Sequence, residues 1–202
     1  MSNIASRQNI NILGAGLCGS LLAILLAQRG FPITIRELRA DPRTAVQAAG
    51  RSINLALSAR GIRALRHAGI FERIEPLLLP MRGRMLHEVS GDTHLLPYGQ
   101  RDDELIYSVS RADLNCILID VAEQKFGVNF HFEHAVTRYD NREHVVHFRN
   151  GTDNYEMHAD ALLVTDGAGS LIRRAYAKDS VINPSESLLP HGYKELLIPP
   201  RT

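Results

Sequence analysis

The sequence has little cysteine and no long hydrophobic run. Its two cysteines, Cys18 and Cys116, lie far apart without any C-x-x-C pairing, so neither a disulfide framework nor a zinc site is indicated, and a reducing compartment fits best. The longest apolar stretch, Leu21–Ala27, is far shorter than the roughly 20 residues of a membrane-spanning helix. The N-terminus also lacks the charged start and apolar segment of a secretory signal. We therefore expect an unsecreted chain without a membrane segment.

Runs of lysine and arginine interleaved with aromatic residues are absent, which disfavours nucleic acid as a partner. The formal net charge is +1, yet residues 1–70 hold nine arginines and no lysine against two acidic residues. This asymmetry favours an anion near the N-terminal part. Arg60, Arg63 and Arg66, however, recur at helical spacing, which is more typical of a solvated helix face than of a binding site.

Two histidine pairs do not complete a metal site. His131 with His134, and His144 with His147, are each three positions apart, and in a strand this spacing sends the two side chains to opposite faces. No array of cysteines or carboxylates accompanies them. We expect no bound metal.

Composition and pattern predict an α/β fold. The 45% apolar and 22% charged content is that of a globular protein, and the length suits one full domain and part of a second. Strands at 9–13 and 31–37 are expected on either side of a helix at 17–29, which gives a Rossmann-like βαβ unit. The remaining strands are expected at 53–57, 82–89, 94–98, 105–109, 128–134, 144–148, 155–158 and 160–165, and the helices at 58–67, 110–126 and from Ser170.

Two parts of this pattern determine the architecture. The strands at 82–89, 94–98 and 105–109 are expected to form an inserted antiparallel sheet. The apolar run at 160–165 is expected to return to the parallel sheet as a buried strand.

Glycines stand at the turn between the first strand and the first helix. Gly14, Gly16 and Gly19 form G-x-G-x-x-G, and Glu37 follows eighteen residues after the last glycine, at the end of the second strand. Such glycines permit a tight turn, the approach of a pyrophosphate and close helix packing, while the helix N-terminus favours negative charge. Glu37 is placed to accept hydrogen bonds from an adenosine ribose. The pattern predicts a dinucleotide site.

The glycine motif alone leaves FAD and NAD open. An ordinary NAD domain continues its alternating βα pattern, whereas this chain diverts into antiparallel strands, which favours FAD. Asp166-Gly167 follows the strand at 160–165 and precedes a helix, so a second cofactor-edge feature is expected at Asp166.

Eight segments, in this order, resemble the kynurenine 3-monooxygenase family of FAD-dependent aromatic hydroxylases. They are GAGLCGSLLAILLAQRG from Gly14, E-x-R-x-D-P-R at 37–43, GRSINLALSARG at 50–61, MRGRM at 81–85, PYG at 97–99, SVSRADLN at 108–115, DG-x-x-S-x-x-R at 166–173 and PHGYKEL at 190–196. The resemblance spans nearly the whole chain, and GRSINLAL, MRGRM and PHGY are its narrowest motifs.

The resemblance implies a set of site residues. Arg84 and Tyr98 would hold the carboxylate of the substrate, and a planar guanidinium matches a carboxylate with two parallel hydrogen bonds. The residues implied to bind FAD are Gly14, Gly16, Leu17, Gly19, Arg36, Glu37, Leu38, Arg39, Ala56, Arg111, Val136, Asp166 and Ser170.

The resemblance also implies a reaction. NADPH would reduce the FAD, oxygen would react with it to form a C4a-hydroperoxide, and L-kynurenine would become 3-hydroxykynurenine, a step of tryptophan catabolism. Because the cofactor carries this chemistry, no catalytic side chain is expected.

The expected domains are an FAD-binding domain at 1–180, with the antiparallel insertion at about 81–110, and a truncated start of a substrate-binding sheet at 181–202. Members of the family are roughly twice as long, so the chain is expected to be truncated. The expected location is cytoplasmic, of the bacterial type, with membrane attachment only through C-terminal helices that are missing here. An NAD-dependent Rossmann oxidoreductase and a non-catalytic FAD-binding fragment stay open as alternatives, as does the oligomeric state.

Overall fold

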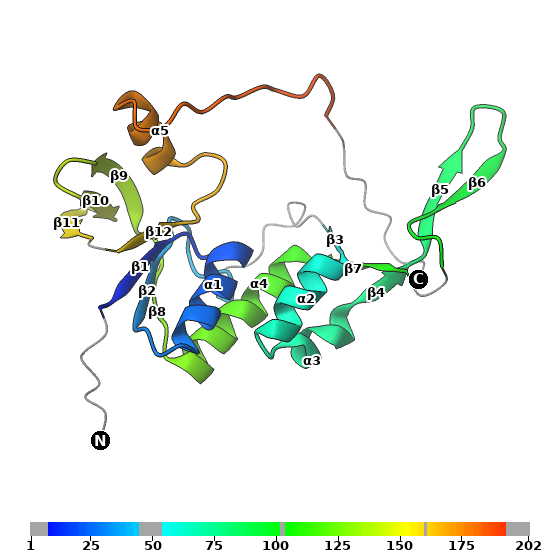
Figure 1. Ribbon diagram of the computed structural model, residues 1–202, viewed down its shortest axis with the longest axis horizontal. Helices are drawn as coiled ribbons and strands as arrows, with labels where there is room; N and C mark the ends of the chain where they lie inside the picture. The colour runs from blue at the N-terminus through cyan, green and yellow to red at the C-terminus, as the bar shows by residue number, and fades with distance from the viewer. Residues whose placement is uncertain (1–7, 45–53, 102–103, 160, 193–202) are drawn as a thin grey trace.

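The computed structural model describes residues 8–44, 54–101, 104–159 and 161–192 (Figure 1). The start of the GRSINLAL motif and the end of the PHGYKEL motif lie outside these residues, as do residues 193–202 of the substrate-binding sheet expected at 181–202. None of the described helices is long and apolar enough to cross a membrane.

A four-stranded parallel sheet forms the centre of the fold. Its strands, in spatial order, are β12 (Leu162–Val164), β1 (Ile10–Leu13), β2 (Ile33–Arg36) and β8 (Asn129–His131). Helix α1 (Leu17–Ala27) connects β1 to β2, and Gly30 follows it with a φ of 81°. The expected βαβ unit and the return of the chain to the parallel sheet are therefore confirmed. The expectation that the returning strand is buried is wrong, because β12 lies at the edge of the sheet and is half-exposed.

Helices cover one face of this sheet. Helix α4 (Arg111–Asp120) packs beside α1 and continues into a single π-helical turn, η2 (Val121–Lys125). Ser110 Oγ accepts a hydrogen bond from the Asp113 N–H at 3.3 Å, which caps α4 as its sequence suggests. Ile12 on β1 packs with α1 and α4 in the main core.

A second sheet covers the opposite face. It consists of β9 (Ala135–Asp140), β10 (Val145–Asn150) and β11 (Asp153–His158), and Figure 1 shows it beyond β1 and β2 from the helices. Because side chains alternate along a strand, Leu13 points away from Ile12 and packs with Val146 and Phe148 of this sheet. The β10–β11 hairpin turns at Gly151, as expected, whereas β9 was not expected from the sequence.

The last described helix, α5 (Leu171–Lys178), packs against β9. Ser170 Oγ caps it by accepting the Arg173 N–H at 3.1 Å. Tyr139 of β9 and Tyr176 of α5 are in contact, with their hydroxyl oxygens 3.2 Å apart. Burial, and then the neighbouring Tyr176, raise the pKa of Tyr139 to about 12, so this phenol is neutral at physiological pH.

The remaining elements lie on the other side of α4. They are β3 (Asn54–Leu57), α2 (Ala59–His67), α3 (Phe71–Ile74), the 3₁₀ turn η1 (Glu75–Leu77), β4 (Leu79–Met81), β5 (Gly83–His87), β6 (Thr93–Pro97) and β7 (Ile106–Ser110). Arg60, Arg63 and Arg66 are exposed on α2, as a solvated helix face requires.

The inserted region is antiparallel, but it is not one sheet of the three expected strands. The expectation that β7 pairs with the β5–β6 hairpin is wrong, because β7 is the central strand of a separate sheet of order β3-β7-β4. Two features separate β7 from the hairpin, a hydrogen bond in the preceding turn and a buried side chain. Glu104 Oε2 accepts the Gln100 N–H at 2.7 Å where the chain turns after β6, and Val109 of β7 is buried in the main core.

Candidate functional site

The glycine loop lies at the carboxyl end of β1, against the end of β12. Gly14 has a φ of 96°, and its N–H donates to the Arg36 carbonyl at 2.8 Å. A Cβ added at Gly14 would lie 2.6 Å from the Thr165 carbonyl oxygen, and one added at Gly19 would overlap the Gly14 carbonyl oxygen. Only glycine allows this turn and this close approach.

Gly16 is different, because nothing in the fold requires a glycine there. Its φ of −73° suits any residue, and a Cβ added to it would meet no atom within 4 Å. The open side of the loop therefore lies at Gly16, where α1 begins. The first turn of α1 itself holds no acidic residue that would oppose an anion at this helix end.

Glu37 reaches the loop from the end of β2. Its Oε2 accepts the Ala15 N–H at 2.8 Å, and its Oε1 accepts the Arg39 N–H at 3.0 Å. A carboxylate oxygen has more than one lone pair, so each retains capacity for a ligand hydroxyl. Leu38, between these anchored residues, is 64% exposed.

Thr165 joins the Asp166-Gly167 turn to the loop. Its Oγ1 lies 2.9 Å from the Leu13 carbonyl oxygen and 3.0 Å from that of Gly14, and its N–H donates to Leu13 at 2.8 Å. The half-buried Asp166 is thereby held beside the glycines. Sequence reasoning missed Thr165, although its position directly before Asp-Gly, at the end of an apolar strand, is a usable signal.

Helix α4 supplies a further contact. Asn115 Nδ2 donates to the Ala15 carbonyl at 3.1 Å, while Asn115 Oδ1 is buried and finds no partner among the described residues. Arg111 is exposed one helical turn earlier, on the same face of α4. Ala56 lies on β3 opposite Ser108 of β7, the strand that leads into α4. Asn115 was not expected from the sequence, although it ends the SVSRADLN segment.

Residues 7–187 match the family model described as the FAD binding domain. The chain belongs to the FAD binding domain family. This membership agrees with the geometry, since Gly16 leaves the loop open to a pyrophosphate, Glu37 retains acceptor capacity for a ribose, and the first turn of α1 holds no acidic residue.

Relatives and solved structures extend this result. The chain is 45% identical to a kynurenine 3-monooxygenase of Xanthomonas campestris pv. campestris over 203 residues, and 43% identical to one of Stenotrophomonas maltophilia over 198 residues. These alignments cover 100% and 97% of this chain but only 44% and 43% of the relatives. The chain thus spans less than half of their length.

The similarity to solved structures supports the fold and no more specific property. The p-nitrophenol 4-monooxygenase of Pseudomonas putida superposes with a TM-score of 0.67 at 17% identity, over 82% of this chain and 43% of that chain. The flavin-dependent halogenase CmlS gives a TM-score of 0.67 at 22% identity, over 86% of this chain and 32% of that chain. The expected α/β, Rossmann-like FAD-binding fold is therefore confirmed.

Within this FAD binding domain, the Arg36 side chain does not face the glycine loop. It crosses to the second sheet, where Nη1 donates to Asn11 Oδ1 at 2.9 Å and Nε to the Tyr155 hydroxyl at 3.2 Å. Its guanidinium also lies over the Phe148 ring, 5.3 Å from the centroid. The contact that Arg36 makes with the loop is the one from its carbonyl to Gly14.

Two other expected cofactor residues have places in the fold. The Ser170 hydroxyl caps α5 and is 5% exposed, and Val136 of β9 lies opposite Phe148 of β10. The side chains of Ser170 and Val136 can contact a ligand only through the surface that these contacts leave free.

The side chains of His131 and His134 do not point to opposite faces, as was expected from their spacing in a strand. The two rings lie together, with centroids 5.4 Å apart, because the strand ends at His131 and Glu133 adopts a φ of 65°. His134 Nδ1 lies 2.5 Å from the Tyr155 hydroxyl. Burial lowers the pKa of both histidines, so both are neutral at physiological pH.

Arg84 and Tyr98 lie on the β5–β6 hairpin, which projects from the body of the molecule (Figure 1). Arg84 pairs with Leu96, and the Tyr98 N–H donates to the Arg82 carbonyl at 3.0 Å. Arg84 and Tyr98 are therefore diagonal neighbours on one face of the hairpin. The structure brings these two residues together, away from the glycine loop.

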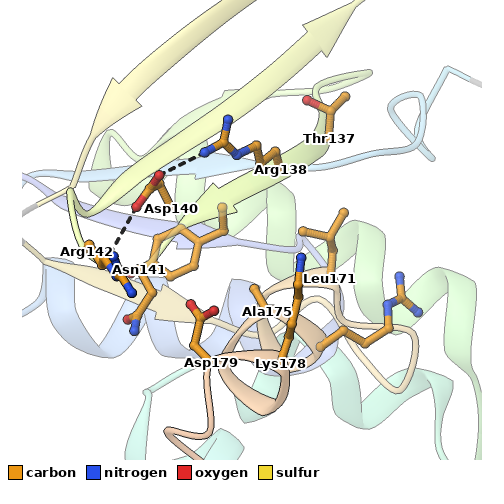
Figure 2. Close-up of a pocket in the computed structure, with 11 residues that line it drawn as sticks. Thr137, Arg138, Asp140, Asn141, Arg142, Leu171, Ala175, Lys178 and Asp179 are labelled. Carbon is orange, nitrogen blue, oxygen red and sulfur yellow. Dashed lines mark hydrogen bonds and ion pairs between the residues drawn. The ribbon is translucent and has the colours of Figure 1, made fainter.

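A pocket of about 530 Å³ lies elsewhere, between β9 and α5 (Figure 2). Its acidic and basic side chains are partly paired: Asp140 accepts from Arg138 Nη2 at 2.9 Å and from the Arg142 N–H at 3.1 Å. None of the residues of the glycine loop lines it. We assign the cofactor to the loop, where the backbone geometry suits it, and not to this pocket.

Proposed function

We propose that this chain is the FAD-holding part of a monooxygenase that hydroxylates L-kynurenine. The observation that carries the proposal is 45% identity, over the full length of the chain, to a protein named kynurenine 3-monooxygenase. In the proposed reaction, L-kynurenine, O2, NADPH and a proton give 3-hydroxykynurenine, NADP⁺ and water.

The bound FAD would supply the redox chemistry that activates oxygen. Under the proposal, the glycine loop with Leu17 and the N-terminus of α1 binds the pyrophosphate, and Glu37 accepts the ribose hydroxyls. The exposed Leu38 and the segment to Arg39 flank the adenosine, with Val136 near them. Arg111, Ala56, Asp166 and Ser170 would lie toward the flavin.

The role proposed for the hairpin is to bind substrate. Arg84 would hold the carboxylate of kynurenine with two parallel hydrogen bonds, and Tyr98, its diagonal neighbour, would add a hydroxyl donor. The residues at 1–180 would form the FAD-binding domain, and those at 181–202 would lead into the substrate-binding part. No side chain of this chain is assigned as a catalytic acid or base.

The test is NADPH oxidation by the purified, FAD-loaded protein with and without L-kynurenine, with the product analysed by mass spectrometry. Kynurenine-dependent oxidation, with a product heavier by one oxygen atom, is the expected result. Retained flavin without kynurenine-dependent oxidation would instead support a non-catalytic FAD-binding chain. An NAD-dependent dehydrogenase would retain no flavin.

A further inference from the structure

Ala15, between the first two glycines of the loop, is hydrogen-bonded on both sides of its backbone. Its N–H donates to Glu37 Oε2 at 2.8 Å. Its carbonyl oxygen accepts from Ser20 Oγ and from Asn115 Nδ2, each at 3.1 Å. Ala15 is 3% exposed, so these bonds are shielded from water and determine the orientation of its backbone.

The orientation of this carbonyl determines that of the next N–H. The Ala15–Gly16 peptide is trans, and in a trans peptide the C=O and the N–H point in opposite directions. With the Ala15 carbonyl held by Ser20 and Asn115, the Gly16 N–H points away from these two donors. The loop is open at this residue, because a Cβ on Gly16 would meet no atom within 4 Å. No acceptor for this N–H is found among the described residues.

We propose that Asn115 is a positioning residue that holds the Ala15–Gly16 peptide with its N–H facing the pyrophosphate of the bound dinucleotide. Without the amide donor, of the two side-chain donors only Ser20 Oγ still holds this carbonyl oxygen, so the peptide is held less firmly and its carbonyl can turn toward the phosphates, which repel it. The inference rests on the proposed function only in taking FAD as that dinucleotide.

The chemistry of the side chain supports a need for this donor. Asn115 Oδ1 is buried without a partner among the described residues, and burying an unpaired acceptor costs free energy. A leucine at this point of α4 would fill the contact with α1 without that cost. Exchanging the two amide atoms does not help, since Oδ1 would then face the Ala15 carbonyl oxygen, and two acceptors repel.

The experiment measures the dissociation constant of FAD, by quenching of its fluorescence, for the wild-type chain and an Asn115→Ala variant. We expect binding about tenfold weaker in the variant, the equivalent of one buried hydrogen bond. Gln28→Ala is the matched control, because Gln28 Nε2 donates to the Ala68 carbonyl at 2.8 Å, the same kind of bond far along α1 from the loop. This control is expected to bind FAD within twofold of wild type.

An Asn115→Asp variant separates peptide positioning from mere packing. An ionised carboxylate has no donor for the Ala15 carbonyl, whereas a protonated carboxyl has one, and burial raises its pKa into an accessible range. We expect the affinity of this variant for FAD to recover as the pH is lowered from 8 to 5. The wild-type chain is measured in parallel, because Glu37 and Asp166 also lie at the loop and are present in both proteins.

Each outcome is decisive. Wild-type affinity in Asn115→Ala, or a defect in Asn115→Asp that does not change with pH, would overturn the inference while leaving the proposed function intact. If Asn115→Ala does not fold, the pH series of Asn115→Asp decides alone. Failure of the wild-type chain to bind FAD would overturn the proposed function and the inference together.

Discussion

At the scale of single residues, the glycines of the loop make different contacts and are expected to respond differently to the same substitution. Gly19→Ala places a methyl group against the Gly14 carbonyl and 2.6 Å from Thr165 Oγ1, so we expect unfolding free energy to fall by roughly 1–3 kcal/mol. Gly16→Ala meets no protein atom, so stability should change by less than about 1 kcal/mol.

FAD affinity distinguishes the two variants further. In Gly16→Ala the methyl group occupies the open side of the loop, so we expect FAD to bind at least tenfold more weakly in a chain that denatures like the wild type. Chemical denaturation of the apoprotein and fluorescence titration with FAD measure the two effects separately. Unchanged FAD affinity in Gly16→Ala would show that the pyrophosphate does not approach this side.

Arg84 provides the residue-scale test of substrate recognition. In the proposed role, Arg84 makes charge-assisted hydrogen bonds worth roughly 1.5–3 kcal/mol, so we expect Arg84→Ala to bind L-kynurenine about 10- to 100-fold more weakly. Arg63→Ala, on the exposed face of α2, is the control. The measurement is a titration of L-kynurenine into FAD-loaded protein, followed by flavin absorbance, and equal affinity in wild type and Arg84→Ala would assign the carboxylate to another residue.

Glu37 lies beside the glycine loop, as the fixed spacing of the motif's acidic residue from the glycines predicts, and its role toward a ribose stays a prediction. The sequence did not predict the direction of the Arg36 side chain. Residues 36–39 were expected to form the site together, although consecutive side chains of a strand point to opposite faces. Ile35 faces the helices, so Arg36 must face the second sheet, where it meets Tyr155. Asn115 and Thr165 contact backbone carbonyls of the loop. The position of Thr165 before Asp-Gly offered a signal for it, whereas no residue pattern pointed to the contact of Asn115.

At the scale of elements, local patterns predicted most strands and helices, but not which strands pair. β5 and β6 are joined by a short turn at Gly91, so their pairing is local and was predictable. The pairing of β7 with β3 and β4 depends on distant segments and on the burial of Val109 in the main core. β9 was missed because a single strand was expected at 128–134, and the left-handed Glu133 ends that strand early.

Arg43 joins the segment after β2 to α4 and η2. Its guanidinium contacts Asp41 at 2.7 Å, Asp120 at 3.0 Å and Glu123 at 2.7 Å. We expect Arg43→Gln to lower the free energy of unfolding at pH 7 by about 1–2 kcal/mol. Arg138→Gln, which breaks the exposed pair with Asp140, should cost less than about 1 kcal/mol.

The pH dependence of the Arg43 effect has a definite sign. The side-chain hydrogen bond from Arg43 lowers the pKa of Asp41 from its ordinary value of 3.8. A carboxyl whose pKa is depressed in the folded state stabilises the fold above its ordinary pKa, and this contribution is lost as the pH falls through the folded value. Denaturation at pH 7 and below pH 4 should therefore show the wild type and Arg43→Gln converging in acid, and a constant difference would contradict this account.

At the scale of the whole molecule, the parallel sheet lies between a layer of helices and the antiparallel sheet of β9, β10 and β11 (Figure 1). The glycine loop lies at the carboxyl edge of the parallel sheet. The parallel sheet followed from the order of elements, because a βαβ unit and a later apolar strand leave few arrangements. The packing of β9, β10 and β11 on its opposite face was not predicted. The hairpin that carries Arg84 has exposed apolar side chains, including Met85 at 52% and Leu95 at 55%. Since the chain spans 44% of its relatives, the proposed substrate site is tested separately from the cofactor site.

The central claim is that the glycine loop holds FAD. The most direct measurement is the visible spectrum of the purified chain after incubation with FAD and desalting, repeated with an excess of NAD⁺ in the incubation. The account predicts flavin absorption close to one FAD per chain, undiminished by NAD⁺. A folded chain that retains no flavin, or that loses it to NAD⁺, would contradict the account.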